Sequence, residues 1–221
     1  LTVQNTTGVF GVMEVSPDFV AQQIDCIFED IRPDAVKIGM VSNAEIIRVI
    51  ADRLYYHRAE NIVADPVMIA TSGGRLMQDS AQEALIEYLL PLARIITPNI
   101  PEAEVLSGKK ISSPEDMKKA AEIIAESLNG DILVKGGHLT ESADDLLFSS
   151  GAAHWFHGSR IDNKNTHGTG CTLSSAIACG LAEGLSTQES VVKAKEFITG
   201  AIVSGLDLGS GCGPLNHMYR L

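Results

Sequence analysis

The amino-acid sequence predicts an α/β fold: a doubly wound, mostly parallel sheet with helices on both faces. Short apolar, β-branched runs alternate along the chain with longer segments of helical periodicity, which is the pattern of repeated strand–helix–strand units. The length of 221 residues suits one domain, and no internal repeat, low-complexity tract or linker divides the chain. We therefore expect residues 1–221 to form a single domain.

The expected strands are runs of Val, Ile, Leu and Ala that stop at polar or glycine residues. They cover residues 35–40, 61–67, 94–97 and 131–135. A further strand-like segment, 153–156, starts the last third of the chain, and a pairing with residues 159–161 is one arrangement for it. Leu1 opens an apolar run that is typical of the end of a strand, which indicates that an N-terminal piece is missing.

The expected helices lie between these strands, and most of them begin at a side chain that can cap the first turn. They cover residues 17–31, 43–57, 80–90, 114–128, 171–183 and 187–206. The expected caps are Ser16, Ser42 or Asn43, Asp79 or Ser80, and Ser113. In the last helix one face carries Val191, Ala194, Ile198, Ile202 and Leu206.

The charge balance excludes several classes of function. With 17 basic and 28 acidic side chains the formal charge is −11, and there is no basic run that would suit nucleic acid or an anionic membrane. No apolar stretch approaches the roughly 20 residues that span a bilayer, and the first residues do not form a signal peptide. We expect a cytoplasmic protein without nucleic-acid or membrane partners.

The four cysteines support the same compartment. Cys26, Cys171, Cys179 and Cys212 form no CxxC pair and have no metal-ligand spacing. Reduced thiols in a cytoplasmic protein explain them better than a disulfide framework. Cys26 and Cys179 lie within helical patterns and are expected to be small core residues.

Polar residues follow the strands at the edge where ligands bind in such a sheet. Asp65 follows one strand, Asn99 and Glu102 follow the next, and Lys135, Gly136, Gly137 and His138 follow a third. A structural sheet could end in any polar residues. This set, however, contains two acids, an amide and an amine, and it suits a metal-bound phosphate better than a hydrophobic ligand.

The strongest local signal is the segment Asn165-Thr166-His167-Gly168-Thr169-Gly170-Cys171-Thr172, which runs directly into a helix. Its glycines allow backbone N–H groups to point inward at the positive end of that helix, which makes an anion-binding site without a cationic side chain. It is neither a Walker A loop nor a dinucleotide fingerprint, because no Gly-Lys-Ser/Thr follows and Leu173 replaces the third glycine. The alternative is a turn that serves packing alone.

Cys171 lies on the first turn of this helix, where the dipole favours the thiolate and so a base or nucleophile. His167 is four residues away, so a cysteine hydrolase is one interpretation. Asp65, Asn99 and Glu102 have a use around Mg²⁺ and a polyphosphate and none in a hydrolase, which favours phosphoryl transfer.

The motifs together resemble those of the hydroxymethylpyrimidine/phosphomethylpyrimidine kinases, a thiamin-biosynthesis branch of the ribokinase family. The resemblance extends from Gln4-Asn5-Thr6 through residues 37–40 to Gly213-Pro214, and it includes Asp65-Pro66-Val67, the 97–103 segment, 135–138 and 165–172. It implies a ribokinase-like fold and phosphorylation, dependent on ATP and Mg²⁺, of the pyrimidine's hydroxymethyl group and then of its monophosphate. It also suggests a homodimer.

The resemblance implies roles for the loop and the strand ends. Gly168, Thr169, Gly170 and Cys171 match the anion hole, with Cys171 where most ribokinase-like enzymes carry an aspartate base; its thiol either accepts the hydroxyl proton or holds the substrate's own phosphate. Asn99 and Glu102 match the group that positions Mg²⁺ through waters. The contacts with ATP phosphates fall to Lys135, to Asp65 in the same network, and to Thr166 near phosphate or ribose.

The pyrimidine itself is expected to contact three residues. Gln4 matches the amide that hydrogen-bonds the aminopyrimidine, and Met40 and Val67 match residues that line the ring. A pyridoxal kinase remains the alternative within the family, because some share the Gly-Thr-Gly-Cys loop. The family's glycine-rich Gly-Gly-Ala-Gly stretch, on its first strand and helix, does not occur in the chain. The resemblance therefore implies that this first strand and helix are missing, and a catalytically silent ligand-binding relative is a further alternative. The glycines of residues 71–74 would permit a lid.

Overall fold

The computed structural model describes the chain except for residues 42, 69–76, 138–143, 159–160, 162 and 164. Its main sheet has six strands in the order β3-β4-β5-β6-β7-β8. The first four pair in parallel, and β7 and β8 are antiparallel to their neighbours. The strands are β3 (Val36–Ile38), β4 (Ile62–Ala64), β5 (Ile95–Ile96), β6 (Asp131–Val134), β7 (Asp145–Ser149) and β8 (Ala152–Phe156).

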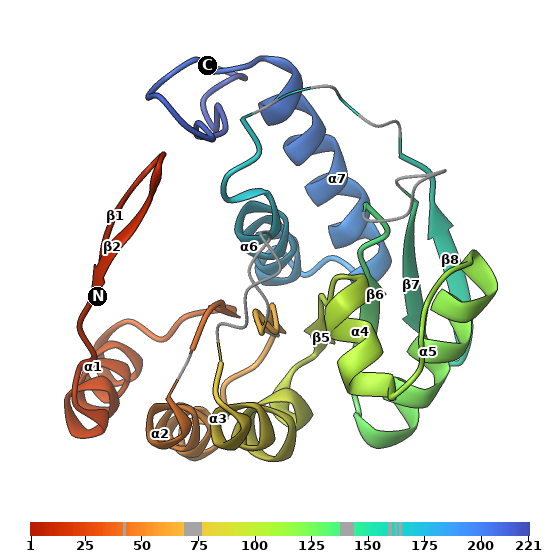
Figure 1. Ribbon diagram of the computed structural model, residues 1–221. Coiled ribbons are helices and arrows are strands. Elements are labelled where there is room, and N and C mark those ends of the chain that lie inside the picture. Colours follow the sequence, from red (N-terminus) through yellow and green to blue (C-terminus); the bar gives the residue numbers. More distant parts are fainter. Residues whose placement is uncertain (42, 69–76, 138–143, 159–160, 162, 164) are drawn as a thin grey trace.

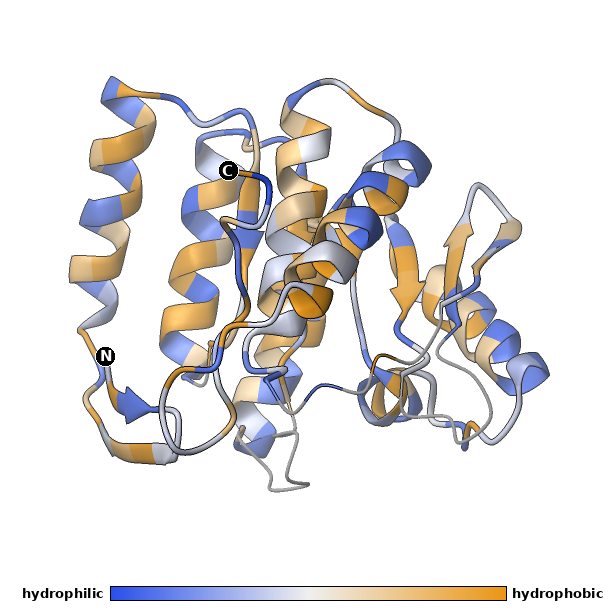
Figure 2. Cartoon of the chain, turned by 90° about the horizontal axis from the view of Figure 1, so that it is seen from above, coloured by the Kyte–Doolittle hydropathy of each residue, from blue (hydrophilic) through white to orange (hydrophobic). Residues whose placement is uncertain are grey.

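Helices cover both faces of this sheet, as predicted. One face carries α2 (Ala44–Tyr56), α3 (Asp79–Ala84), α4 (Ile100–Ser107) and α5 (Pro114–Ser127) over a core that includes Ile96, Ile132 and Leu146. The other carries α6 (Thr169–Ala182) and α7 (Thr187–Val203), which lie side by side over Val63, Ile95 and Leu133. The helices mix hydrophobic and hydrophilic residues along their length, as expected of elements that bury one face (Figure 2).

Three of the predicted caps are confirmed. The side chains of Ser16, Asn43 and Ser113 accept hydrogen bonds from first-turn amides of α1 (Pro17–Asp30), α2 and α5. The expected cap at Asp79 or Ser80 is wrong, because α3 begins after Gln78, which makes no side-chain cap bond.

Two predicted helices differ from the expectation. The segment expected over 80–90 is helical throughout, but it changes from α3 to a π turn at Leu85–Leu89 and a 3₁₀ turn at Leu90–Leu92, because Pro91 lacks an N–H and crowds the preceding turn. The last helix stops at Val203, and Leu206 lies beyond Gly205, whose φ of 61° is left-handed. The helix α4 is additional to the expected set.

The expected pairing of residues 153–156 with 159–161 is wrong, because β8 pairs with β7 instead. The two strands are joined by Ser150 and Gly151, both with positive φ, as in the two-residue turns that connect tight hairpins. Within the described part of this segment, Ile161 is not in a strand.

The N-terminal residues form a separate hairpin of β1 (Thr2–Asn5) and β2 (Gly8–Val12), which stands apart from the main sheet (Figure 1). A strand does end at Asn5, but its only described partner is β2. The turn of the hairpin meets the C-terminal segment, where the amide of Gly211 donates to Oγ1 of Thr6 at 3.3 Å. The hairpin therefore joins the two ends of the chain.

The core prediction for Cys26 and Cys179 is wrong, since both are exposed. Cys26 lies on α1, a helix at the edge of the molecule with no fully buried residue, and Cys179 lies on the outer face of α6. No disulfide joins any of the four cysteines, all of which lie within the described residues. Among the described helices, none combines the length and apolar composition that crossing a bilayer requires.

Candidate phosphoryl-transfer site

The candidate site lies beyond the carboxyl ends of the strands, next to the strand residues that face α6 and α7. Val63, Ile95 and Leu133 belong to the core under these two helices. Side chains two residues apart on a strand point to the same face, so Asp65, Thr97 and Lys135 continue these three rows beyond the carboxyl ends of the strands. The apolar rows thus become charged and polar where they leave the sheet.

Asp65 is the centre of this polar edge. Its side chain is 4% exposed, and its Oδ1 accepts from Nζ of Lys135 at 2.7 Å and from Oγ1 of Thr97 at 3.0 Å. Its own amide donates to the carbonyl oxygen of Ile38 at 2.9 Å, which ties it to β3. The structure therefore brings together two predicted phosphate-contact residues, Asp65 and Lys135, and adds Thr97, for which no role was predicted.

The N-terminus of α6 reaches the same edge. Gly168 precedes it with φ 83°, a left-handed conformation that favours glycine, and supplies no side chain to accept from the first-turn amides. A Cβ on Gly170 would lie 3.3 Å from Oδ2 of Asp65 and 3.5 Å from Nζ of Lys135. The glycine loop and the lysine are therefore neighbours, and Cys171 is exposed on the same first turn.

Thr169 and Thr166 close the loop on itself. Thr169 donates to the carbonyl oxygen of Thr166 with both its amide, at 3.2 Å, and its hydroxyl, at 2.7 Å. The Thr166 side chain is exposed and lies 3.7 Å from Sγ of Cys212. The side chain of Asn165 is buried and holds the loop to the C-terminal segment, accepting from the amide of Gly213 at 2.9 Å and donating to the carbonyl of Leu206 at 3.2 Å.

Asn99 and Glu102 make a reciprocal cap on α4. Oδ1 of Asn99 accepts from the Glu102 amide at 2.9 Å, and Oε2 of Glu102 accepts from the Asn99 amide at 2.8 Å. The carboxyl group of Glu102 also accepts from the Met68 amide at 3.4 Å. Burial, partly offset by the charge of Lys135, raises the pKa of Glu102 to about 7.

A magnesium ion fits this edge as a partner held by few protein atoms. Asp65, Asn99 and Glu102 offer the carboxylate and amide oxygens that Mg²⁺ prefers, and the charges of Asp65 and Lys135 both act on Glu102. In the described part of the chain no three His, Cys, Asp or Glu side chains cluster as a metal cage. Such a donor set would suit a metal that keeps its waters and binds mainly to substrate phosphates.

The three predicted pyrimidine contacts come from different elements. Gln4 lies on β1, with its Nε2 3.3 Å from Nε2 of His167 in the glycine loop. Met40, 49% exposed, and Val67, half-buried, follow the neighbouring strands β3 and β4. The hairpin thus brings Gln4 to the glycine loop before α6.

Two residues near this site, Asp145 and Lys195, were not predicted. The Asp145 carboxylate accepts from the Gly136 amide at 2.9 Å and from Lys195 of α7. The Asp145–Lys195 pair joins residues 50 positions apart, which no local sequence pattern indicates. His138 and the glycines of residues 71–74 lie outside the described residues.

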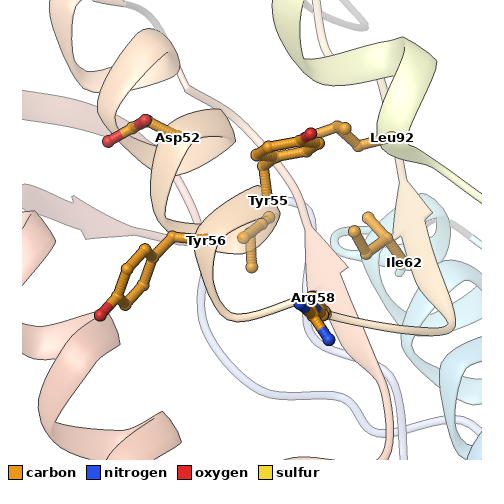
Figure 3. Close-up of a pocket in the computed structure, with 8 residues that line it drawn as sticks. Asp52, Tyr55, Tyr56, Arg58, Ile62 and Leu92 are labelled. Carbon is orange, nitrogen blue, oxygen red and sulfur yellow. The ribbon is translucent and has the colours of Figure 1, made fainter.

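An open cavity of about 770 Å³ lies elsewhere (Figure 3). It is lined by the C-terminal end of α2, including Tyr55 and Tyr56, and by Ile62, the first residue of β4. These residues mark the amino edge of the parallel strands, opposite the edge of Asp65. No predicted site residue lines this cavity.

The chain matches one protein family over nearly its whole length. Residues 1–216 match the family described as phosphomethylpyrimidine kinase. The chain belongs to this family. It is therefore a kinase, that is, a phosphotransferase, of thiamin biosynthesis. Its fold is ribokinase-like.

Relatives in this family differ in length. The hydroxymethylpyrimidine/phosphomethylpyrimidine kinase of Rhizobium meliloti is 46% identical, and the match covers 100% of this chain and 84% of that protein. The thiamine biosynthesis bifunctional protein ThiED of Geobacter sulfurreducens is 48% identical over 99% of this chain, which spans only 45% of that longer protein.

A solved structure of an ADP complex has the same fold. An ADP complex of Bacillus subtilis pyridoxal kinase superimposes with a TM-score of 0.88 at 34% identity, covering 99% of this chain and 83% of that one. The ribokinase-like fold is therefore shared by kinases named for two different ring alcohols.

Proposed function

We propose that the chain transfers the γ-phosphoryl group of ATP to the hydroxymethyl group of 4-amino-5-hydroxymethyl-2-methylpyrimidine, and then a second phosphoryl group to the monophosphate. The observation that carries this proposal is the position of Gly170, at the open start of α6, beside the Lys135–Asp65 ion pair. Backbone amides of this first turn and one ammonium group would then lie close together, which suits an anion in transfer. The names of the relatives support the pyrimidine as the substrate.

The chain's own residues divide the work. The amides of Gly168, Gly170 and Cys171 would hold the transferring phosphoryl group, since the Thr169 amide donates to the carbonyl of Thr166. Lys135 would hold ATP phosphates while Asp65 keeps its ammonium in place. When bound, Mg²⁺ would neutralise part of the phosphate charge, with Asn99 and Glu102 as its outer partners. Thr166 would lie near the nucleotide.

Cys171 would take the proton of the attacking hydroxyl, since it is exposed on the first turn of α6. Gln4 would bind the aminopyrimidine, with Met40 and Val67 against the ring. The nucleophile, base and anion site then meet at one edge of the sheet, where open α/β sheets bind ligands. As a working assembly we propose a cytoplasmic homodimer.

The test measures ADP release by the intact protein with Mg-ATP and each of three alcohols: the hydroxymethylpyrimidine, its monophosphate and pyridoxal. We expect turnover of both pyrimidines. No ADP above background with any alcohol would contradict the kinase. Faster turnover of pyridoxal would move the assignment to pyridoxal kinase, the alternative that the 34% identical neighbour supports.

A further inference from the structure

A second ion pair lies beside Asp65 and Lys135 and has no part in the proposed transfer. Lys195 of α7 donates to Oδ2 of Asp145, and Oδ1 of Asp145 accepts from the Gly136 amide at 2.9 Å. The side chains of Lys195 and Asp145 are only 19% and 11% exposed. Charges this far from water are stable only when they are paired, and loss of one partner leaves the other to find a new counter-ion.

The register of the sheet places Asp145 next to Lys135. In the β6–β7 ladder Leu133 faces Leu147 and Val134 faces Leu146. Continuing that register by one residue sets Lys135 opposite Asp145, on the same face of the sheet. Lys135 therefore has two carboxylates within its neighbourhood, Asp65 and Asp145.

The turn after Lys135 is packed closely against β7. A Cβ at Gly136 would overlap the carbonyl oxygen of Asp144, so glycine is required there. Gly136 has no side chain, and the hydrogen bond from its backbone amide to Oδ1 of Asp145 holds it in place. Asp145 thus controls the position of the peptide that follows Lys135.

We propose that Lys195 is a positioning residue for Lys135. By neutralising Asp145, it fixes the Gly136 amide and prevents Asp145 from taking the Lys135 ammonium. That ammonium then stays on Asp65 and next to Gly170, where the proposed function places nucleotide phosphates. The inference rests on the proposed function only for the identity of that anion.

The first experiment measures the dissociation constant of Mg-AMP-PCP, a non-hydrolysable ATP analogue, together with the KM values and kcat. For Lys195→Met we expect analogue binding weakened roughly tenfold, as for the displacement of one charge-assisted contact. The KM for the pyrimidine should change less than about threefold. Lys195→Arg should restore binding, because it keeps the charge beside Asp145.

A matched control lies two residues away on the same helix. Lys193 pairs with Glu183 at 3.1 Å and is 59% exposed. Lys193→Met should leave analogue binding unchanged. Equal effects of the Lys193 and Lys195 variants, or none from Lys195→Met, would overturn the proposal.

The double variant Asp145→Asn/Lys195→Met separates positioning from folding. It removes both buried charges, keeps an acceptor for Gly136 and leaves no carboxylate to compete for Lys135. We expect it to bind the analogue more tightly than Lys195→Met alone, within about threefold of the parent. Should Lys195→Met not fold, this double variant still decides the matter, since a tenfold loss in it contradicts the proposal.

Failure of this inference can be distinguished from failure of the proposed function. A parent protein that binds the analogue but phosphorylates none of the alcohols contradicts the function, while the dissociation constants still test Lys195. A parent that phosphorylates the pyrimidine with an unaffected Lys195→Met contradicts this inference alone. A parent that does not bind the analogue contradicts both.

Discussion

Two helices begin at the same edge of the sheet, and their first turns are built in opposite ways. The start of α4 is closed, because Asn99 and Glu102 exchange hydrogen bonds with each other's amides. The start of α6 is open, because Gly168 precedes it and has no side chain to accept. A helix that satisfies its own first turn is a structural support, whereas one that leaves amides free can bind an anion.

The largest effect is expected at the open start. Cys171→Ala should lower the turnover number by roughly 10²–10⁴ if the thiol is the general base, and leave ATP binding nearly unchanged because the amides remain. Steady-state kinetics and analogue binding check both parts. Cys179→Ala, an exposed cysteine on the same helix, is the control. Unchanged turnover would show that the proton goes elsewhere.

Glu102, in the closed start of α4, should make the free energy of unfolding depend on pH. Since burial raises the pKa of Glu102 from 4.5 to about 7, the folded chain holds a proton that the unfolded chain has lost between these values. This stabilisation is complete below pH 4.5 and is lost as pH rises through about 7, a change on the order of 3 kcal/mol. Urea unfolding in EDTA from pH 5 to 8 measures it.

Glu102→Gln should flatten this slope, because the amide resembles the protonated carboxyl and does not titrate. Glu104, on the same helix, is the control. Hydrogen bonds from Ile111 and Lys110 lower the pKa of Glu104 below its usual value, so its contribution is lost only as pH falls below that range. A slope that survives in Glu102→Gln but disappears in Glu104→Gln would contradict the assignment.

The smallest effect is expected at Asn99, where a variant distinguishes its capping of α4 from its proposed role toward Mg²⁺. Asn99→Ala should cost about 1 kcal/mol of unfolding free energy through the lost cap. It should also raise the Mg²⁺ concentration needed for half-maximal activity. Asn43→Ala removes a similar cap from α2, a helix that carries none of the proposed Mg²⁺ partners, and should lower stability without altering the Mg²⁺ requirement. Identical metal titrations for the two variants would remove Asn99 from that role.

Parallel strands explain how much of this site the sequence could predict. Asp65 and Lys135 are 70 positions apart, yet each follows a buried strand, and such ends meet at one edge of the sheet. The glycines and Cys171 were identifiable because they lie within one continuous loop. Local chemistry also placed the caps at Ser16, Asn43 and Ser113.

Contacts between layers could not be predicted in this way. Lys195 and Asp145 are 50 positions apart, and their pairing depends on β7 running antiparallel to β6 and on how α7 lies across the sheet. Exposure of Cys26 and Cys179 likewise depends on which faces of α1 and α6 have neighbours. Helical periodicity identifies the apolar stripe but gives no account of what lies against the other faces.

The order of the strands also sets how the chain tolerates changes in length. After β8, the outermost strand, the chain returns to α6, which packs on β3 and β4. That return crosses four strand spacings to β4, roughly 19 Å. The twelve residues 157–168 could reach about 40 Å when extended.

Asn163 and Asn165 donate hydrogen bonds to the carbonyls of Ile202 and Leu206 near the end of this crossing. Natural insertions and deletions should therefore collect before Asn163, and the six positions from it to Gly168 should keep a constant length.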